Sequence, residues 1–279
     1  RANINVCIME KSAPGGQLNK SSTIENYPGF NKISGPELAY SFYEQILNLN
    51  IPFINEEVIE IEDKTSYKII KTNKKTYTCK GIILALGRKP RSFDNESVSS
   101  LEGKGVSYCS LCDGPLFKNQ DVSIIGGGNS ALEESLYLSD ICKSVTIINR
   151  RDVLRGDKML VDKVLKKDNI NILYNSEVVE FNKKDDFLES LTIKTNDKLN
   201  KLEVKACFIF IGYVPATDFL NNLDILDEKG YIKTDKNLKT DIPFIYACGD
   251  TINKEVYQIV TATGEGAVSA ISFINDYNS

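Results

Sequence analysis

Residues 121–151 read DVSIIGGGNSALEESLYLSDICKSVTIINRR, and this stretch decides the fold. The apolar, β-branched run at 121–125 predicts a strand that ends in glycines. Asn129 and Ser130 then open a predicted helix that extends to residue 142. Its apolar side chains recur at helical spacing: Ala131, Leu132, Leu136 and Leu138. Residues 145–148 predict a second strand, and strand, glycine turn, helix and strand within about 30 residues form a βαβ unit of a parallel sheet.

The glycine turn has the spacing G-x-G-x-x-A, from Gly126 to Ala131. Glycines at these places let the backbone turn sharply and approach a pyrophosphate, which the free N–H groups of the helix start can bind. The turn therefore predicts a dinucleotide site, with Gly126, Gly128, Asn129 and Ser130 as binding residues. A tight turn without a ligand is the alternative.

Three arginines follow the second strand in NRRDVLR, residues 149–155. An NAD site normally places an acid about 20 residues past the glycines, on the ribose 2′-hydroxyl. Guanidinium groups bind phosphate instead, often through two parallel hydrogen bonds. Arg150, Arg151 and Arg155 therefore favour the 2′-phosphate of NADPH, and a solvated basic turn is the alternative.

A strand of similar pattern opens the chain in INVCIMEK, residues 4–11. It ends in Glu10, and an acid there suits the unphosphorylated adenosine ribose of FAD or NAD. The glycine loop that should precede such a strand is not in the sequence. We therefore expect roughly 20 further residues ahead of Arg1, holding a strand and a G-x-G-x-x-G turn.

Two similar segments, KGIILALGRKP (80–90) and KACFIFIGYVP (205–215), lie far apart in the chain. Each is an apolar strand followed by glycine and proline, as expected for the two connections to an inserted domain. We expect one dinucleotide-binding domain at 91–215, inserted into a second domain made of 1–90 and 216–279. The predicted fold class is α/β with two Rossmann-like domains, and 279 residues are enough for two.

The last third of the chain holds an apolar strand, PFIYACGD (243–250), that ends in Gly249 and Asp250. A helix is predicted over 261–277, with small residues near its start that permit close approach of a ligand. In a flavoprotein, the strand-end aspartate would bind the ribityl-phosphate chain.

Composition excludes several classes of protein. The net charge of −4 and pI near 5.2 argue against a nucleic-acid-binding protein, and no apolar run approaches the ~20 residues of a membrane span. The chain has no histidine, which rules out histidine-based triads and histidine-ligated metal sites. Seven cysteines, an odd number without a secretory signal, indicate a reducing compartment, and we expect a cytoplasmic protein.

Two of the cysteines, Cys109 and Cys112, stand three apart in SYCSLCDGP, residues 107–115. Half of a zinc site, a structural disulfide, two unrelated core thiols and a redox pair are the four interpretations. Zinc would need ligands that the chain offers only as distant acids, and a structural disulfide is unusual in a reducing compartment. The nucleotide signatures nearby favour a redox pair.

Several motifs, taken in order, resemble those of low-molecular-weight bacterial thioredoxin reductases. They are APGGQL (13–18), IENYPGF (24–30), VSYCSLCDG (106–114), IIGGGNSALEE (124–134), NRRDVLR (149–155) and YACGD (246–250). The resemblance implies an FAD domain interrupted by an NADPH domain that carries the redox pair, a homodimer, and thioredoxin as partner. It also implies a hinge rotation of the inserted domain at residues 88–91 and 213–217.

The resemblance gives roles to individual residues. Cys112 would face the flavin, Cys109 would attack the partner disulfide, and Asp113 would donate a proton. Electrons would pass from NADPH to FAD, to the cysteine pair, and on to thioredoxin. The residues expected to bind FAD are Glu10, Gly15, Gly16, Gln17, Asn26, Gly249, Asp250 and Gln258. Those expected to bind NADPH are the four of the glycine turn and the three arginines.

Three positions depart from the family pattern. Leu86 replaces the threonine of the usual ATG strand end, Asn149 replaces the histidine of HRR, and Tyr257 replaces the arginine of the C-terminal RQ pair. Rival functions are reduction of a peroxiredoxin or glutaredoxin-like partner, electron supply by ferredoxin, and a flavin-free nucleotide-binding protein.

Overall fold

The computed structural model describes residues 2–278 and divides them into two compact units. Unit 1 comprises the chain up to residue 89 together with residues from 214 onward, and unit 2 comprises residues 90–213. The domain limits predicted from the sequence are 90/91 and 215/216. The glycine loop expected ahead of Arg1 lies outside the described residues.

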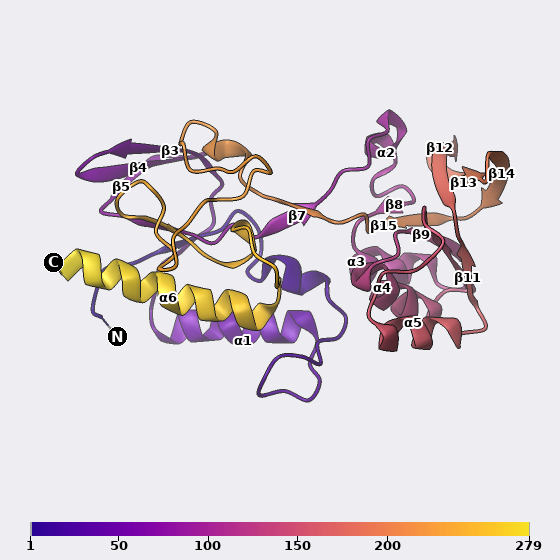
Figure 1. The fold of residues 1–279 in the computed structure, drawn as a ribbon, viewed down its shortest axis with the longest axis horizontal. Coiled ribbons are helices and arrows are strands. Elements are labelled where there is room, and N and C mark those ends of the chain that lie inside the picture. Colours follow the sequence, from indigo (N-terminus) through magenta and orange to yellow (C-terminus); the bar gives the residue numbers. More distant parts are fainter. Residues whose placement is uncertain (1, 279) are drawn as a thin grey trace. The chain divides into compact units, whose positions relative to one another are not determined.

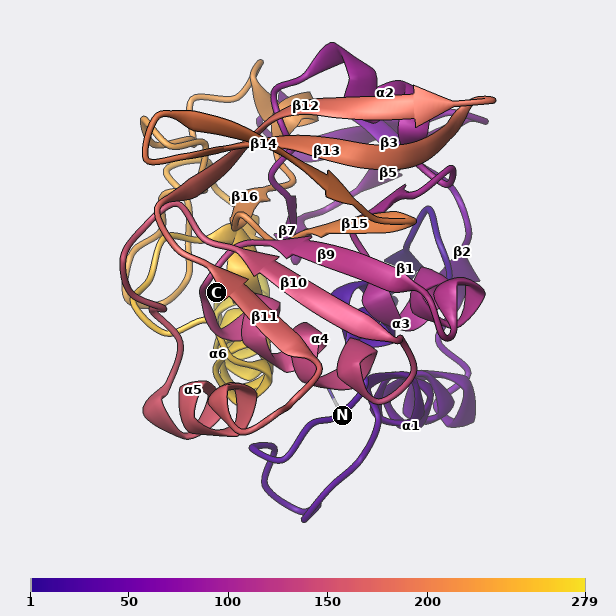
Figure 2. The same cartoon turned by 90° about the vertical axis from the view of Figure 1, so that its right-hand side faces the viewer.

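Unit 2 is built on a five-stranded parallel sheet with the strand order β11-β10-β9-β15-β8 (Figure 2). In chain order the strands are β8 (Val106–Ser107), β9 (Asp121–Ile125), β10 (Ser144–Ile148), β11 (Ile170–Leu173) and β15 (Ala206–Ile209). Four of the five residues of β9 and of β10 are buried, as expected for parallel strands covered on both faces.

Helices cover one face of this sheet and a small antiparallel sheet covers the other (Figure 2). The helices are α3 (Ser110–Asp113), α4 (Asn129–Ser139) and α5 (Lys158–Leu165); the 3₁₀ turn η2 (Gly114–Phe117) follows α3 directly. The antiparallel strands are β12 (Ser176–Lys184), β13 (Phe187–Thr195) and β14 (Lys198–Glu203). The short α2 (Glu96–Leu101) precedes β8.

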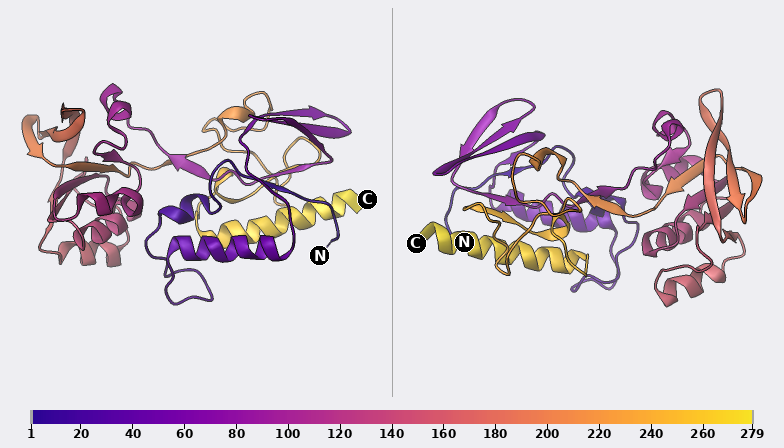
Figure 3. Two further views of the ribbon diagram at one scale, coloured as in Figure 1. Left: turned by 180° about the vertical axis from the view of Figure 1, so that it is seen from behind. Right: turned by 45° about the horizontal axis from the view of Figure 1, so that its top comes forward.

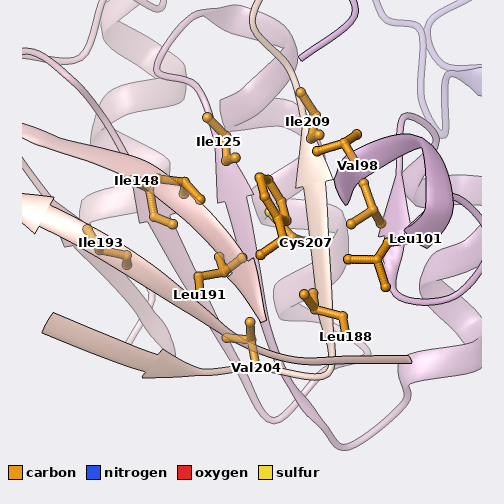
Figure 4. Close-up of a cluster of buried hydrophobic side chains, with 13 residues drawn as sticks. Val98, Leu101, Ile125, Ile148, Leu188, Leu191, Ile193, Val204, Cys207 and Ile209 are labelled. Atoms are coloured by element: carbon orange, nitrogen blue, oxygen red, sulfur yellow. The ribbon is translucent and has the colours of Figure 1, made fainter. Parts of the chain in front are cut away.

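A hydrophobic cluster joins the two sheets of unit 2 (Figure 4). Leu191 and Ile193 of β13 pack there against Ile125, Ile148 and Ile209 of the parallel strands. On the helical face, residues of α4 pack on β9 and β15 in a second cluster. The carboxyl ends of β9 and β10 therefore lie in a rigid scaffold, which fixes the loops that follow them.

Unit 1 holds two short parallel pairs and one antiparallel sheet (Figure 1). The pairs are β1 (Ile8–Met9) with β2 (Phe53–Ile54), and β6 (Ile82–Leu84) with β17 (Ile245–Ala247). The antiparallel sheet consists of β3 (Val58–Lys64), β4 (Tyr67–Thr72) and β5 (Thr76–Cys79). Short 3₁₀ helices are η1 (Gly16–Lys20), η3 (Asp218–Leu220) and η4 (Gly249–Thr251).

The strand predicted over 4–11 is only partly formed. Among the described residues β1 pairs with β2 alone, and Val6 and Cys7, just ahead of it, are exposed. Its pairing with β2 is confined to Ile8 and Met9.

Helices α1 (Gly35–Asn48) and α6 (Ile259–Asn278) run along the same side of unit 1 (Figure 3). Helix α1 begins with a capping box in which the Ser34 hydroxyl accepts the Glu37 N–H, and the Glu37 carboxylate accepts the Ser34 N–H. Helix α6 is the one predicted over 261–277. No helix within residues 2–278 is both long enough and apolar enough to cross a membrane.

The chain passes between the units through β7 (Arg88–Pro90) and β16 (Tyr213–Pro215), which pair with each other. Both strands lie within the segments 88–91 and 213–217, where the sequence predicts a hinge. Rotation at these segments stays a prediction.

Candidate active site

Cys109 and Cys112 form a disulfide at the start of α3. Cys109 is the N-cap residue of this helix, and its Sγ accepts the N–H of Cys112 at 3.2 Å. Cys112 is exposed, whereas Cys109 is only 7% exposed. Cys112 is therefore the more accessible residue of the pair. Two cysteines joined to each other are neither half of a zinc site nor two separate thiols. Within the described residues no cluster of potential metal ligands is found.

Asp113 is held beside the disulfide by a serine that the sequence analysis did not single out. Its Oδ2 accepts a hydrogen bond from the Ser107 hydroxyl at 2.6 Å, and Ser107 Oγ in turn accepts the N–H of Cys109 at 3.0 Å. Ser107 ends strand β8 and is 6% exposed. Its position at the end of a strand and two residues before the first cysteine was the available signal.

A buried carboxyl group lies behind the pair, on α4. Glu134 is 8% exposed, and burial, with a contribution from the charge of Glu133, raises its pKa to about 7. The Ser110 hydroxyl, which stands between the two cysteines and is completely buried, lowers the pKa of Glu134 and so acts against this shift. Sequence patterns gave no signal for this contact, because it depends on how α3 packs on α4.

Unit 2 contains a cavity of about 620 Å³ at the carboxyl ends of β9 and β10. It is lined by every residue predicted to bind NADPH: Gly126, Gly128, Asn129, Ser130, Arg150, Arg151 and Arg155. Four lining residues are arginines, Arg91 being the fourth, and Glu177 is the one acid among them. This excess of positive charge fits a ligand that carries phosphate groups.

The glycine turn gives the cavity its shape. Gly126 has φ +138, and a Cβ there would lie 2.3 Å from the Phe210 carbonyl oxygen. A Cβ on Gly128 would instead meet nothing within 4 Å, so its backbone faces open space. Gly128 caps α4 without a side-chain hydrogen bond, which leaves N–H groups of the first turn for a ligand. These features fit the pyrophosphate of a dinucleotide.

Asn149 organises the arginine loop. It is 5% exposed, and its amide donates to the carbonyl oxygens of Arg151 at 3.1 Å and Val153 at 2.8 Å. The Arg155 N–H donates to the Gly127 carbonyl at 2.7 Å, which ties the loop to the glycine turn. Among the residues that the structure describes, the guanidinium groups of Arg150, Arg151 and Arg155 form no ion pair. They are exposed cations, as a phosphate site requires.

Asn129 has a structural contact in addition to its place in the cavity wall. Its side chain accepts the Asp157 N–H at 2.7 Å and donates to the Asp157 carboxylate at 2.9 Å. These bonds hold the segment that leads into α5 against the start of α4.

The residues predicted to bind FAD lie in unit 1, where the structure brings some of them together. Gln17 donates to the Arg88 carbonyl oxygen at 3.0 Å, and the Arg88 guanidinium donates to Asp250 at 3.1 Å. Asn26 donates to Gln258 at 2.9 Å. Arg88 is a further residue that the sequence analysis did not single out.

Glu10 makes its contacts elsewhere. Its carboxylate accepts the Ser12 N–H at 2.9 Å, and its carbonyl oxygen accepts a bond from Asn55 at 3.0 Å. Glu10 directly follows Met9, so it stands at the carboxyl end of β1, as predicted for an acid that binds ribose hydroxyls.

The three unit 1 glycines predicted to bind FAD all have positive φ: Gly15 at +116, Gly16 at +51 and Gly249 at +75. A Cβ on Gly16 would meet nothing within 4 Å, so a ligand can approach its backbone. The N–H of Gly249 donates to the Glu265 carboxylate at 2.8 Å. The accessible backbone of Gly16, the Glu10 carboxylate at the end of β1 and the side-chain amides fit a hydroxyl-rich ligand such as FAD.

Comparison with known proteins defines the class. The model of the family described as pyridine nucleotide-disulphide oxidoreductase matches residues 1–266, and the chain belongs to this family. The thioredoxin reductase of Ureaplasma parvum is 43% identical over 274 residues, covering 97% of this chain and 88% of that protein. These matches confirm the predicted resemblance to thioredoxin reductases.

Solved structures agree with the sequence matches. Lactococcus lactis thioredoxin reductase has a TM-score of 0.96 at 36% identity, with 100% of this chain and 93% of that chain covered. The thioredoxin reductase of T. acidophilum has a TM-score of 0.94 at 34% identity, with 100% and 92% covered. The predicted class, α/β with two Rossmann-like domains, is confirmed.

Proposed function

We propose that this protein is a thioredoxin-disulfide reductase that uses NADPH and FAD. The observation that supports this most is the Cys109–Cys112 disulfide with Asp113 held beside it, on the same unit as a cavity lined by the glycine turn and four arginines. NADPH would supply a hydride, and FAD would pass its two electrons to the disulfide. Unit 2 would bind NADPH and unit 1 would bind FAD.

The residues of this chain would then act in sequence. Cys112, the exposed sulfur, would receive the electrons, and the opened pair would become a thiolate and a thiol. The Cys112 N–H, which already donates to Cys109 Sγ, would stabilise negative charge on Cys109. Cys109 would attack the partner disulfide once opening of the pair exposes it. Cys112 would resolve the mixed disulfide, which restores the Cys109–Cys112 bond.

Proton transfer would involve Asp113. Attack by Cys109 breaks the sulfur–sulfur bond of the partner and leaves one partner sulfur as a thiolate. Asp113, held by Ser107 next to the pair, would protonate that leaving thiolate. One cycle would consume one NADPH and one proton and yield one partner dithiol.

The resemblance supports two further proposals. A homodimer is supported by large apolar side chains exposed on α1 and α6: Tyr40, Leu47, Val268 and Ile271. A cytoplasmic location is supported by the five cysteines outside the disulfide, all of which are free. Sedimentation equilibrium tests the first and fractionation of cells tests the second.

Steady-state oxidation of NADPH by the purified, flavin-loaded protein tests the function. We expect turnover with thioredoxin that needs both Cys109 and Cys112. Cys112→Ser should accumulate a mixed disulfide between Cys109 and thioredoxin, visible by non-reducing electrophoresis, because the resolving thiol is lost. Turnover with a peroxiredoxin or a glutaredoxin-like protein but not with thioredoxin would contradict the proposal, and so would reduction of thioredoxin by reduced ferredoxin but not by NADPH. Purification without any bound flavin, and no uptake of added FAD, would contradict it as well.

A further inference from the structure

Arg88 connects the residues of unit 1 that we propose to bind FAD. It follows Gly87, whose φ of +65 turns the chain out of β6. The Arg88 carbonyl oxygen accepts the Gln17 amide at 3.0 Å, and its guanidinium donates to Asp250 at 3.1 Å. Segments 71 and 162 residues away in sequence thus meet at one residue, the first at its backbone carbonyl and the second at its side chain.

The guanidinium of Arg88 also stacks on an aromatic ring. Its central carbon lies 3.8 Å from the centroid of the Tyr257 ring, well within the range of a cation–π contact. Tyr257 directly precedes Gln258, which is bonded to Asn26. The Arg88 side chain is 19% exposed and that of Asp250 is 29% exposed, so water screens their ion pair only in part.

A second cation near Asp250 does not perform the same task. Lys254 lies 3.7 Å from the Asp250 carboxylate, beyond hydrogen-bonding distance, and bonds instead to Glu265 at 2.8 Å. Glu265 accepts the Gly249 N–H. Lys254 and Glu265 therefore hold the backbone at Gly249, whereas Arg88 is the side chain that orients the Asp250 carboxylate.

We propose that Arg88 is a positioning residue for the flavin cofactor: its side chain, stacked on Tyr257, holds the Asp250 carboxylate in the arrangement that binds FAD, next to Gln17, which bonds to the Arg88 backbone carbonyl. The proposal rests on the proposed function, because FAD is the ligand that these residues would bind. A flat guanidinium can stack face to face on a ring while it donates a hydrogen bond in its own plane, and the tetrahedral ammonium group lacks this planar geometry. This combination also gives Tyr257, a departure from the family pattern, a structural role.

The dissociation constant of FAD, measured by quenching of flavin fluorescence on titration into the apo form of the full-length protein, tests the proposal. Arg88→Met should weaken binding by about tenfold or more, through loss of one charge-assisted hydrogen bond and one cation–π contact. Arg88→Lys should recover only part of the loss. Lys89→Met is the matched control, since Lys89 is the exposed neighbour paired with Asp218, and it should bind FAD as the wild type does.

The outcomes separate the possible explanations. Wild-type affinity in Arg88→Met, or equal weakening by Lys89→Met, would overturn the proposal. NADP⁺ binding to unit 2 and the thermal midpoint of the apo protein report whether each variant is folded. If Arg88→Met does not fold, the FAD affinity of Arg88→Lys is the test instead. Wild-type FAD affinity in Arg88→Lys would then overturn the proposal. A wild-type protein that takes up no FAD would instead overturn the proposed function, and this inference with it.

Discussion

At the scale of single residues, two polar side chains near the redox pair, Ser107 and Glu134, are not revealed by local sequence. The spacing of Cys109 and Cys112 and the adjoining Asp113 are visible in nine letters of sequence, so they could be predicted. Ser107 and Glu134 could not, because each acts through a contact between elements: β8 with α3, and α4 with α3. The roles of all these residues in turnover stay predictions.

Ser107→Ala should slow the reduction of thioredoxin by about tenfold, because Asp113 loses the hydrogen bond that positions it as an acid. Reduction of the disulfide by NADPH under anaerobic conditions should keep its wild-type rate. Ser100→Ala, which removes an exposed hydroxyl in the same unit, is the control. Wild-type turnover in Ser107→Ala across pH 6 to 9 would show that the Ser107 contact is dispensable.

Glu134 predicts a pH dependence of stability. Burial raises its pKa from 4.5 to about 7, so between these values the native state binds more protons than the unfolded state. Stability then falls as the pH rises through this window. Relative to the wild type, Glu134→Gln should gain nothing near pH 4 and roughly 3 kcal/mol above pH 8.

Chemical denaturation at several pH values measures this difference. Glu133→Gln is the matched control, since Glu133 is the exposed neighbour on the same helix. A constant difference between Glu134→Gln and the wild type from pH 4 to 8 would contradict the assigned pKa.

At the scale of elements, the βαβ unit was predictable because its strands are buried on both faces and its helix has regular apolar spacing. The helix expected over 129–142 is α4, Asn129–Ser139, and the strand expected over 145–148 is β10, Ser144–Ile148. The strand expected over 4–11 was predicted too long, because strand length depends on neighbours that an apolar pattern does not specify.

Two glycines of the turn should respond differently to the same substitution. Gly126→Ala should destabilise the protein by about 2–3 kcal/mol, since a Cβ would meet the Phe210 carbonyl at a φ that L-residues avoid. Gly128→Ala should keep wild-type stability, because its φ of −97 is ordinary and its Cβ would meet no protein atom within 4 Å. It should weaken NADP⁺ binding, because that Cβ would take up space in the cavity where the dinucleotide would bind. Thermal unfolding and calorimetric titration with NADP⁺ measure the two effects, and equal stability of the two variants would refute this account of the turn.

At the scale of the whole molecule, the sequence predicts an α/β protein in which one dinucleotide-binding domain interrupts another. The fold class follows from repeated strand–glycine segments and is confirmed by the solved relatives. The ligand of each unit, and rotation at β7 and β16, stay predictions, since apolar patterns report burial within a unit and carry no information on motion between units.

The free cysteines make the central claim measurable. Burial raises the pKa of Cys142 to about 11 and that of Cys207 to about 12, so neither thiol should react quickly at neutral pH. Alkylation that depends on reduction should therefore occur at Cys109 and Cys112, while Cys7, which is exposed, reacts in either state.

Anaerobic reduction of the flavin-loaded protein by NADPH, followed by alkylation and mass spectrometry, tests the account most directly. We predict that bleaching of the flavin is accompanied by alkylation of both Cys109 and Cys112. A bleached flavin with the Cys109–Cys112 disulfide still intact would contradict the transfer of electrons from nucleotide through flavin to this pair.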